Sequence, residues 1–202
     1  MKIYYILVVK NEIDVIQSHI ENIAPQVDTV NVMDNGSTDG TREWLEGNDL
    51  VTRLFDGSEK TFNNSLRGEV FRMIESNEDD WVLFLGADHF LEEDLRAFIG
   101  NAVDAKCNAF NADHITFYYT DVDYNNRDSE DHSLDIRERR LYYETDFNFM
   151  VASRASKHLK WAVSASDNWT IPSLRAYDKH LAVSHYPFRT PDQIQKRLDD
   201  RR

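Results

Sequence analysis

Two apolar segments of this chain end abruptly in acidic and small residues. Residues 30–33 lead directly into Asp34, and residues 81–85 lead into Gly86-Ala87-Asp88. Continuous apolar runs of this kind are typical of strands that are buried on both faces of a sheet. In open α/β sheets, ligands bind outside the carboxyl ends of the strands. The two carboxylates at these ends therefore indicate a site for a nucleotide and a divalent cation.

Strand and helix patterns alternate through the first hundred residues. Apolar runs predict buried strands, and apolar residues at helical spacing predict helices between them. The predicted strands are 3–9, 29–33, 51–55 and 81–85, and the predicted helices are 15–23, 40–46, 62–76 and 92–99. This order predicts an α/β fold, with a mainly parallel central sheet, right-handed crossovers and helices on both faces.

The second half of the chain is less regular. It predicts a strand at 115–119, a strongly acidic surface loop at 121–135, a late strand at 181–185 and a terminal helix at 191–197. No internal repeat or low-complexity linker divides the sequence, so residues 1–202 are expected to form a single domain. The chain stops in what reads as an uncapped helix, which indicates a ragged or truncated end.

Composition argues against several classes of function. The formal charge is −13, from 36 acidic and 23 basic residues, and this lacks the basic footprint of a nucleic-acid-binding protein. No stretch approaches the roughly 20 apolar residues of a membrane span. The single cysteine, Cys107, cannot form an internal disulfide. A reducing compartment, and so a cytoplasmic location, is the expectation.

Both acidic segments also have a structural interpretation. Asn35-Gly36 is a frequent hairpin turn, although a helical pattern follows it here instead of an alternating strand. Asp88 could cap a following helix, and one carboxylate is a poor metal site by itself.

The basic candidates leave similar alternatives. His185 lies at a strand end, where it is either a structural residue or a metal ligand. Arg67 and Arg189 either bind phosphate or form surface ion pairs. The remaining candidates are expected to be ordinary surface residues, namely His114, His132 and Lys157.

Four segments together resemble a known enzyme family. Val9-Lys10-Asn11-Glu12 is similar to the family's V-x-N-E segment, and residues 34–41 are close to its D-N-x-S-T-D-G-T loop. Residues 80–90 are similar to D-W-V-L-F-L-D-A-D-E-F, which ends in an Asp-x-Asp motif, and residues 185–196 to H-Y-P-F-R-S-P-E-Q. All four occur in order and at plausible spacing. On these segments the chain resembles family 2-type glycosyltransferases with the GT-A fold.

The resemblance implies a reaction and a set of partners. The donor would be a nucleoside diphosphate sugar, with a UDP-sugar as the first expectation, and the acceptor a saccharide or lipid-linked molecule. The cofactor would be Mn²⁺ or Mg²⁺, and transfer would be inverting. Residues 1–100 would form the nucleotide-binding half and residues 101–202 the acceptor-side half.

The resemblance also implies roles for individual residues. Asp88 and His185 would bind the cation. A carboxylate is needed to deprotonate the acceptor, and Asp167 is the candidate, with an Asx-turn as its structural alternative. The donor would be held by Asn11, Glu12, Asp34, Asn35, Arg67, Asp88 and Arg189.

Two positions depart from the family pattern. Gly86 stands where the first aspartate of the Asp-x-Asp motif usually lies, and His89 stands where glutamate is common. Because a carboxylate is missing, cation binding is expected to be weak unless the diphosphate of the nucleotide supplies oxygens.

Two other functions stay open. One is a nucleotide-binding protein on the same fold that has lost transfer, and Gly86 is its main support. The other is a nucleotidyltransferase. That class usually has a glycine-rich phosphate loop after the first strand, and residues 8–16 contain no glycine.

Overall fold

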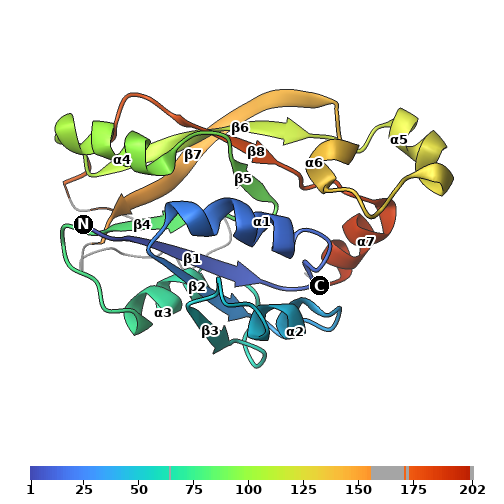
Figure 1. Cartoon of the computed structure of the whole chain (residues 1–202), viewed down its shortest axis with the longest axis horizontal. Helices are drawn as coiled ribbons and strands as arrows, with labels where there is room; N and C mark the ends of the chain where they lie inside the picture. Colours follow the sequence, from blue (N-terminus) through green and yellow to red (C-terminus); the bar gives the residue numbers. More distant parts are fainter. Residues whose placement is uncertain (64, 156–170, 172, 201–202) are drawn as a thin grey trace.

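The computed structural model describes residues 1–63, 65–155, 171 and 173–200. Within these ranges the chain forms an eight-stranded sheet with the order β3-β2-β1-β4-β7-β6-β8-β5 (Figure 1). The strands are β1 (Ile3–Val9), β2 (Thr29–Asp34), β3 (Arg53–Asp56), β4 (Trp81–Phe84), β5 (His89–Leu91), β6 (Ala109–Phe117), β7 (Tyr143–Arg154) and β8 (Leu181–His185).

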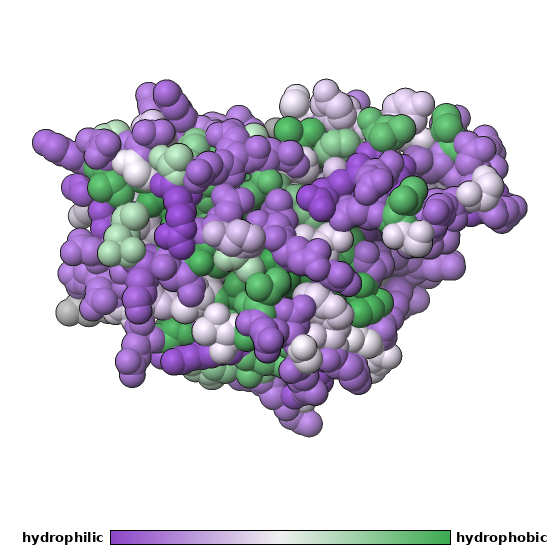
Figure 2. All heavy atoms as spheres, in the orientation of Figure 1, coloured by the Kyte–Doolittle hydropathy of each residue, from purple (hydrophilic) through white to green (hydrophobic). Residues whose placement is uncertain are grey.

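Helices connect and cover the strands. They are α1 (Ile16–Ile23), η1 (Ala24–Gln26), α2 (Thr41–Glu46), α3 (Ser65–Met73), α4 (Leu95–Asp104), α5 (Asp121–Asn126), η2 (Arg127–Ser129), α6 (Ile136–Arg139) and α7 (Pro191–Asp200). No helix in the described ranges is both long and apolar enough to cross a membrane. Polar side chains cover most of the face shown in Figure 2, with apolar patches between them.

β1 lies between two hydrophobic cores. All seven of its residues are buried. Ile3, Tyr5 and Leu7 pack into the core that contains α1 and α4, whereas Tyr4 and Ile6 pack into the core that contains α3. Because successive side chains of a strand point to opposite faces, a fully apolar strand needs cover on both sides. The predicted α/β fold with helices on both faces is confirmed.

The first half of the sheet is parallel. β1 pairs in parallel with β2 and β4, and β2 pairs in parallel with β3. Val9 lies opposite Asp34 in this register. The carboxyl ends of β1, β2 and β4 therefore meet at one edge of the sheet, as the sequence predicted.

The second half of the sheet mixes strand directions. β7 pairs antiparallel with both β4 and β6, so it joins the two halves of the chain. β6 and β8 are parallel, and β5 pairs antiparallel with β8 at the end of the sheet. The sequence analysis missed β5 and β7, because β5 has only three residues and polar residues interrupt the apolar pattern of β7.

The acidic stretch 121–135 lies on the surface, as predicted, but the prediction that it is a loop is wrong. It contains α5 and η2. Thr120 caps α5 by accepting from the backbone N–H of Asp123, whose carboxylate accepts from the backbone N–H of Thr120 in return. Such a reciprocal capping box stabilises a helix start that has no apolar face to mark it.

His19 is a buried histidine that links α1 to the end of the sheet. Its Nδ1 lies 2.6 Å from the carbonyl oxygen of His89, and its Nε2 lies 2.6 Å from the hydroxyl of Tyr5. Since a carbonyl only accepts, Nδ1 carries the hydrogen and Nε2 accepts from the tyrosine. Burial lowers the pKa of His19 to about 4. The neutral ring is therefore part of the folded structure.

This histidine makes stability depend on pH. The unfolded chain takes up a proton near pH 6.5 and the folded chain only near pH 4, so the free energy of unfolding falls as pH drops through that window. Linkage gives a loss of about 2 kcal/mol between pH 7 and pH 5. His19→Gln, measured by urea unfolding with divalent metal chelated, should lack this part of the wild-type pH dependence. The exposed His132→Gln is the control and should keep it, and parallel profiles for His19→Gln and wild type would contradict the assignment.

Candidate functional site

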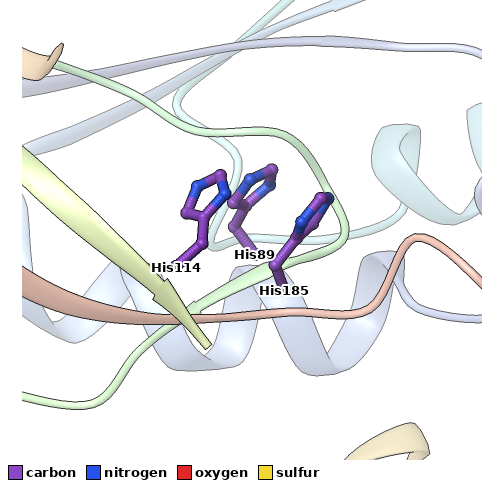
Figure 3. Close-up of side chains that lie close together, drawn as sticks. All are labelled: His89, His114 and His185. Atoms are coloured by element: carbon purple, nitrogen blue, oxygen red, sulfur yellow. The ribbon is translucent and has the colours of Figure 1, made fainter. Parts of the chain in front are cut away.

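Three histidines from neighbouring strands lie on one face of the sheet (Figure 3). His89 begins β5, His185 ends β8, and the two residues are direct cross-strand partners. His114 comes from β6, two residues before Thr116, which is the partner of His185. The side chains of residues on adjacent strands and of like register share a face. The three rings therefore meet although 96 residues, 89 to 185, separate the first from the last.

The three rings form a compact, buried cluster. The rings of His89 and His185 are stacked with centroids 4.2 Å apart, and each lies 4.8 Å from the ring of His114. One nitrogen from each ring can be chosen so that all three lie within 4.8 Å of one another. His89 and His114 are buried, and His185 is partly exposed. The cluster thus opens toward solvent on the side of His185.

The environment keeps two of these rings neutral. Burial lowers the pKa of His89, and the nearby His185 lowers it further. Burial also lowers the pKa of His114 to about 3, with additional contributions from His89 and His185. A neutral imidazole has a lone pair available for a metal ion.

Asp88 lies directly against the cluster. Its Oδ1 is 2.9 Å from Nδ1 of His89, and its Oδ2 is 3.6 Å from Nε2 of His185. Burial raises the pKa of this carboxyl, but the adjacent His89 and His185 lower it by more, so it lies well below its ordinary range. Asp88 does not cap the following helix, since Asp94 accepts the capping hydrogen bond at the start of α4. Asp88 and His185, the two residues predicted to bind a cation, therefore lie next to each other.

Gly86 leaves the space that this arrangement occupies. A β-carbon at residue 86 would lie 2.7 Å from Oδ1 of Asp88 and 2.9 Å from Nδ1 of His89. The backbone of Gly86 is not in the left-handed region, which among the described glycines holds Gly36 and Gly40. The glycine is therefore explained by side-chain space and not by backbone strain.

Arg189 is a buried cation beside this cluster. Its guanidinium lies 2.5 Å from a carboxylate oxygen of Glu12 and 2.8 Å from one of Asp14. Burial lowers the pKa of Arg189, but Glu12, Asp14 and the nearby Asp88 raise it by more. The pairs connect the segment after β1 with the segment after β8. Arg189 was predicted to bind phosphate, and in this structure its partners are protein carboxylates.

A second buried arginine supports the first. Arg140 is 1% exposed, and its guanidinium donates to Glu130 and to the carbonyl oxygen of Arg189. Its cation also lies over the ring of Tyr119, 4.7 Å from the centroid. The α5–α6 segment is therefore tied to the backbone of the site.

Asp34, Asn11 and Asn35 organise the loop after β2. The carboxylate of Asp34 accepts from the backbone N–H groups of Gly36 and Ser37. Asn11, in a left-handed conformation, accepts from the backbone N–H of Thr38, and Asn35 donates to two carbonyls of the 57–60 loop. These contacts hold the loop at the carboxyl edge of the sheet.

Two further candidate residues of the site are Arg67 and Asp167. Arg67, on α3, lies close enough to affect the pKa values of Tyr5 and His89, so its charge belongs to the same region. Asp167, the candidate base, lies outside the described residues, as does Lys157.

Sequence reasoning missed two histidines. His114 was expected on the surface, and this is wrong, since it is 4% exposed. Its signal was the alternation of β6, in which Phe110, Ala112, His114 and Thr116 all face inward. His89 was treated only as a departure from a motif. Its position opposite His185 could not be predicted without knowing that β5 pairs with β8.

Comparison with known proteins gives structural matches of low similarity. No protein-family model matches the sequence, and no curated protein matches it. S. aureus TarS 1-349 in complex with UDP-GlcNAc matches with a TM-score of 0.47 and 19% identity, over 59% of this chain and 35% of that chain. The cytidylyltransferase LicC of Streptococcus pneumoniae matches with a TM-score of 0.37 and 10% identity, over 76% of this chain and 68% of that chain.

Bifunctional IspDF from Campylobacter jejuni matches with a TM-score of 0.43 and 10% identity, over 77% of this chain and 41% of that chain. The chain spans between 22% and 36% of the length of the TarS chains that it matches. Every one of these TM-scores is below 0.5, so the matches carry no argument about the function of this chain.

The buried Arg189 predicts a large effect on stability. Arg189→Met removes the cation and leaves Glu12 and Asp14 without it, so the free energy of unfolding should fall by about 3–5 kcal/mol. Adding Glu12→Gln to this variant should recover part of the loss. Arg96→Met, which breaks an exposed ion pair with Asp28, is the matched control and should cost less than about 1 kcal/mol. Equal urea midpoints for Arg189→Met and wild type would contradict this account.

Proposed function

We propose that this protein is an inverting glycosyltransferase that moves a sugar from a nucleoside diphosphate sugar to a saccharide or lipid-linked acceptor. A UDP-sugar is the proposed donor. The observation that supports this best is the placement of two acidic sites at one edge of the sheet. Asp34 ends β2, and Asp88 follows β4, on either side of β1. This is the edge at which parallel α/β sheets bind nucleotides.

The charges of the site suit a diphosphate leaving group. Departure of a nucleoside diphosphate builds negative charge, which fixed cations stabilise. Asp88 and His185 would hold a Mn²⁺ or Mg²⁺ ion there, and this ion would neutralise the diphosphate. The buried carboxylate and the imidazoles beside it are a suitable donor set for a divalent cation. Arg67 would add a further positive charge.

The ordered loop after β2 would form the nucleoside side of the site. Asn11, Asp34 and Asn35 fix this loop, and Glu12 is held in place by Arg189. In this proposal Arg189 contributes to phosphate binding through the orientation of Glu12 and through its own positive charge. Asp167 would deprotonate the acceptor hydroxyl as general base.

Donor turnover is the first test. The protein is incubated with Mn²⁺ and a panel of nucleotide sugars that includes UDP-GlcNAc, and release of nucleoside diphosphate is measured. One donor class should be turned over. Asp88→Asn should lower the rate at least about 100-fold, because it removes the charge that holds the cation. Asp128→Asn changes a carboxylate that is 90% exposed and should leave the rate unchanged.

The products separate the alternatives. Nucleotide binding without release of diphosphate would identify a binding protein that has lost transfer. Release of pyrophosphate from a nucleoside triphosphate and a sugar phosphate would identify a nucleotidyltransferase. Neither binding nor release with any donor would contradict the proposal entirely.

Nucleotide affinity tests the loop. Asp34→Ala removes a buried acceptor of two backbone hydrogen bonds, so the loop loses its fixed shape. A charge-assisted hydrogen bond of this kind contributes about 1.5–3 kcal/mol, and UDP affinity should fall tenfold or more. Calorimetry with UDP provides the measurement, and the exposed Asp49→Ala is the control. Equal affinity of Asp34→Ala and wild type would remove this loop from the binding site.

A further inference from the structure

We infer that His89, His114 and His185 form a three-imidazole metal centre, which binds a borderline transition-metal ion such as Zn²⁺ or Co²⁺ before any nucleotide arrives. The proposed metal centre is the cation site of the proposed glycosyltransferase, so any role of the ion in catalysis rests on the proposed function. The binding itself is a property of the three histidines and can be measured separately.

The geometry of the cluster supports coordination. Nitrogen ligands around a tetrahedral zinc ion lie about 3.3 Å apart, given Zn–N distances near 2.0–2.1 Å. The three rings offer nitrogens within 4.8 Å of one another, so the stacked rings of His89 and His185 must turn toward a common point when an ion binds. Each ligand comes from a different strand, and β5, β8 and β6 are adjacent in the sheet. The scaffold is therefore rigid, which favours a preformed site.

The ring of His89 is buried without a hydrogen-bond partner in the described part of the chain. Its Nε2, like its Nδ1, makes no hydrogen bond within the described part of the chain, although both atoms are shielded from solvent. Such a group costs free energy unless it finds a partner. A metal ion between the three rings is a partner of the correct chemistry.

Asp88 orients the cluster. Its Oδ1 lies 2.9 Å from Nδ1 of His89. Although this Nδ1 makes no hydrogen bond in the described part of the chain, the adjacent negative charge favours a hydrogen on Nδ1 and leaves the lone pair on Nε2. In metal sites a carboxylate in this position accepts a hydrogen bond from the imidazole and raises its basicity. The ring of His185 has its own polar contact, because its Nδ1 lies 3.4 Å from the hydroxyl of Thr116. Asp88 also supplies one negative charge beside the three imidazoles.

Gly86 leaves room for the side chains of the cluster. A side chain there would collide with Oδ1 of Asp88 and with Nδ1 of His89. The missing carboxylate and the added imidazole are thus linked, because the ring of His89 needs the space that Gly86 leaves. The sequence alone predicted cation binding that depends on nucleotide. With three nitrogen ligands already in place, we expect binding without nucleotide.

The ligand set determines which ions bind. Imidazole nitrogens favour Zn²⁺, Co²⁺ and other late first-row ions, whereas Mg²⁺ prefers oxygen ligands. The inference therefore predicts the affinity order Zn²⁺ over Co²⁺ over Mn²⁺, with little Mg²⁺ bound in the absence of nucleotide.

The experiment uses untagged, metal-free full-length protein. Each of the four ions is titrated by calorimetry without nucleotide, and the Co²⁺ form is examined by visible absorption. His114→Phe should lower Zn²⁺ and Co²⁺ affinity roughly 100-fold or more and abolish the wild-type Co²⁺ absorption bands. The exposed His132→Phe is the matched control and should change neither. Unchanged Zn²⁺ affinity in His114→Phe would overturn the inference.

A measurement on the wild type covers the case in which His114→Phe does not fold. X-ray absorption of the Zn²⁺ form should show three imidazole ligands, and fewer than three would overturn the inference. The outcomes also separate this inference from the proposed function. Tight Zn²⁺ binding without sugar-nucleotide turnover would leave the metal centre standing and remove the glycosyltransferase. Sugar-nucleotide turnover by a protein whose Zn²⁺ affinity is unchanged by His114→Phe would leave the glycosyltransferase standing and remove the metal centre.

Discussion

Asp88 is an ionised carboxylate buried at the edge of a hydrophobic core, and the structure around it compensates for that burial. Moving a charge out of water is costly unless opposite charge or hydrogen-bond donors surround it. His89 and His185 lie against its two oxygens, and Arg189 is close enough for its pKa to be affected by the same carboxylate. A cation bound at this point would complete the compensation. The arrangement therefore supports the proposed cation site.

The sheet topology places these groups together. Asp88 follows β4, in the parallel half of the sheet. His114 and His185 lie on β6 and β8, on the other side of β7. β5 folds back to pair with β8, and this brings His89 opposite His185. The backbone of Asp88 is also fixed, because its carbonyl accepts from the N–H of Tyr186. The site thus depends on contacts between the two halves of the chain.

Much of the parallel half could be predicted from the sequence, because its signals are local. β1 is an uninterrupted apolar run, and its boundaries at Ile3 and Val9 are as predicted. The position of Asp34 at a strand end follows from the same reasoning. The histidine cluster could not be predicted in this way, since it depends on the pairing of β5, β8 and β6. His114 looks like any polar residue in a strand until its neighbours on the inward face are known. The helix α5 was missed because a capping box, and not apolar spacing, marks its start.

The central claim is that Asp88 and the three histidines form one cation site on which the diphosphate of a nucleotide sits. Anomalous diffraction from crystals grown with Zn²⁺ or Mn²⁺ and soaked in UDP tests this most directly. The account predicts one strong anomalous peak within bonding distance of His89, His114 and His185, about 2.0–2.2 Å from their nitrogens, with a diphosphate oxygen on the open side of the ion. A crystal in which UDP is bound with no anomalous density among these three rings would contradict it.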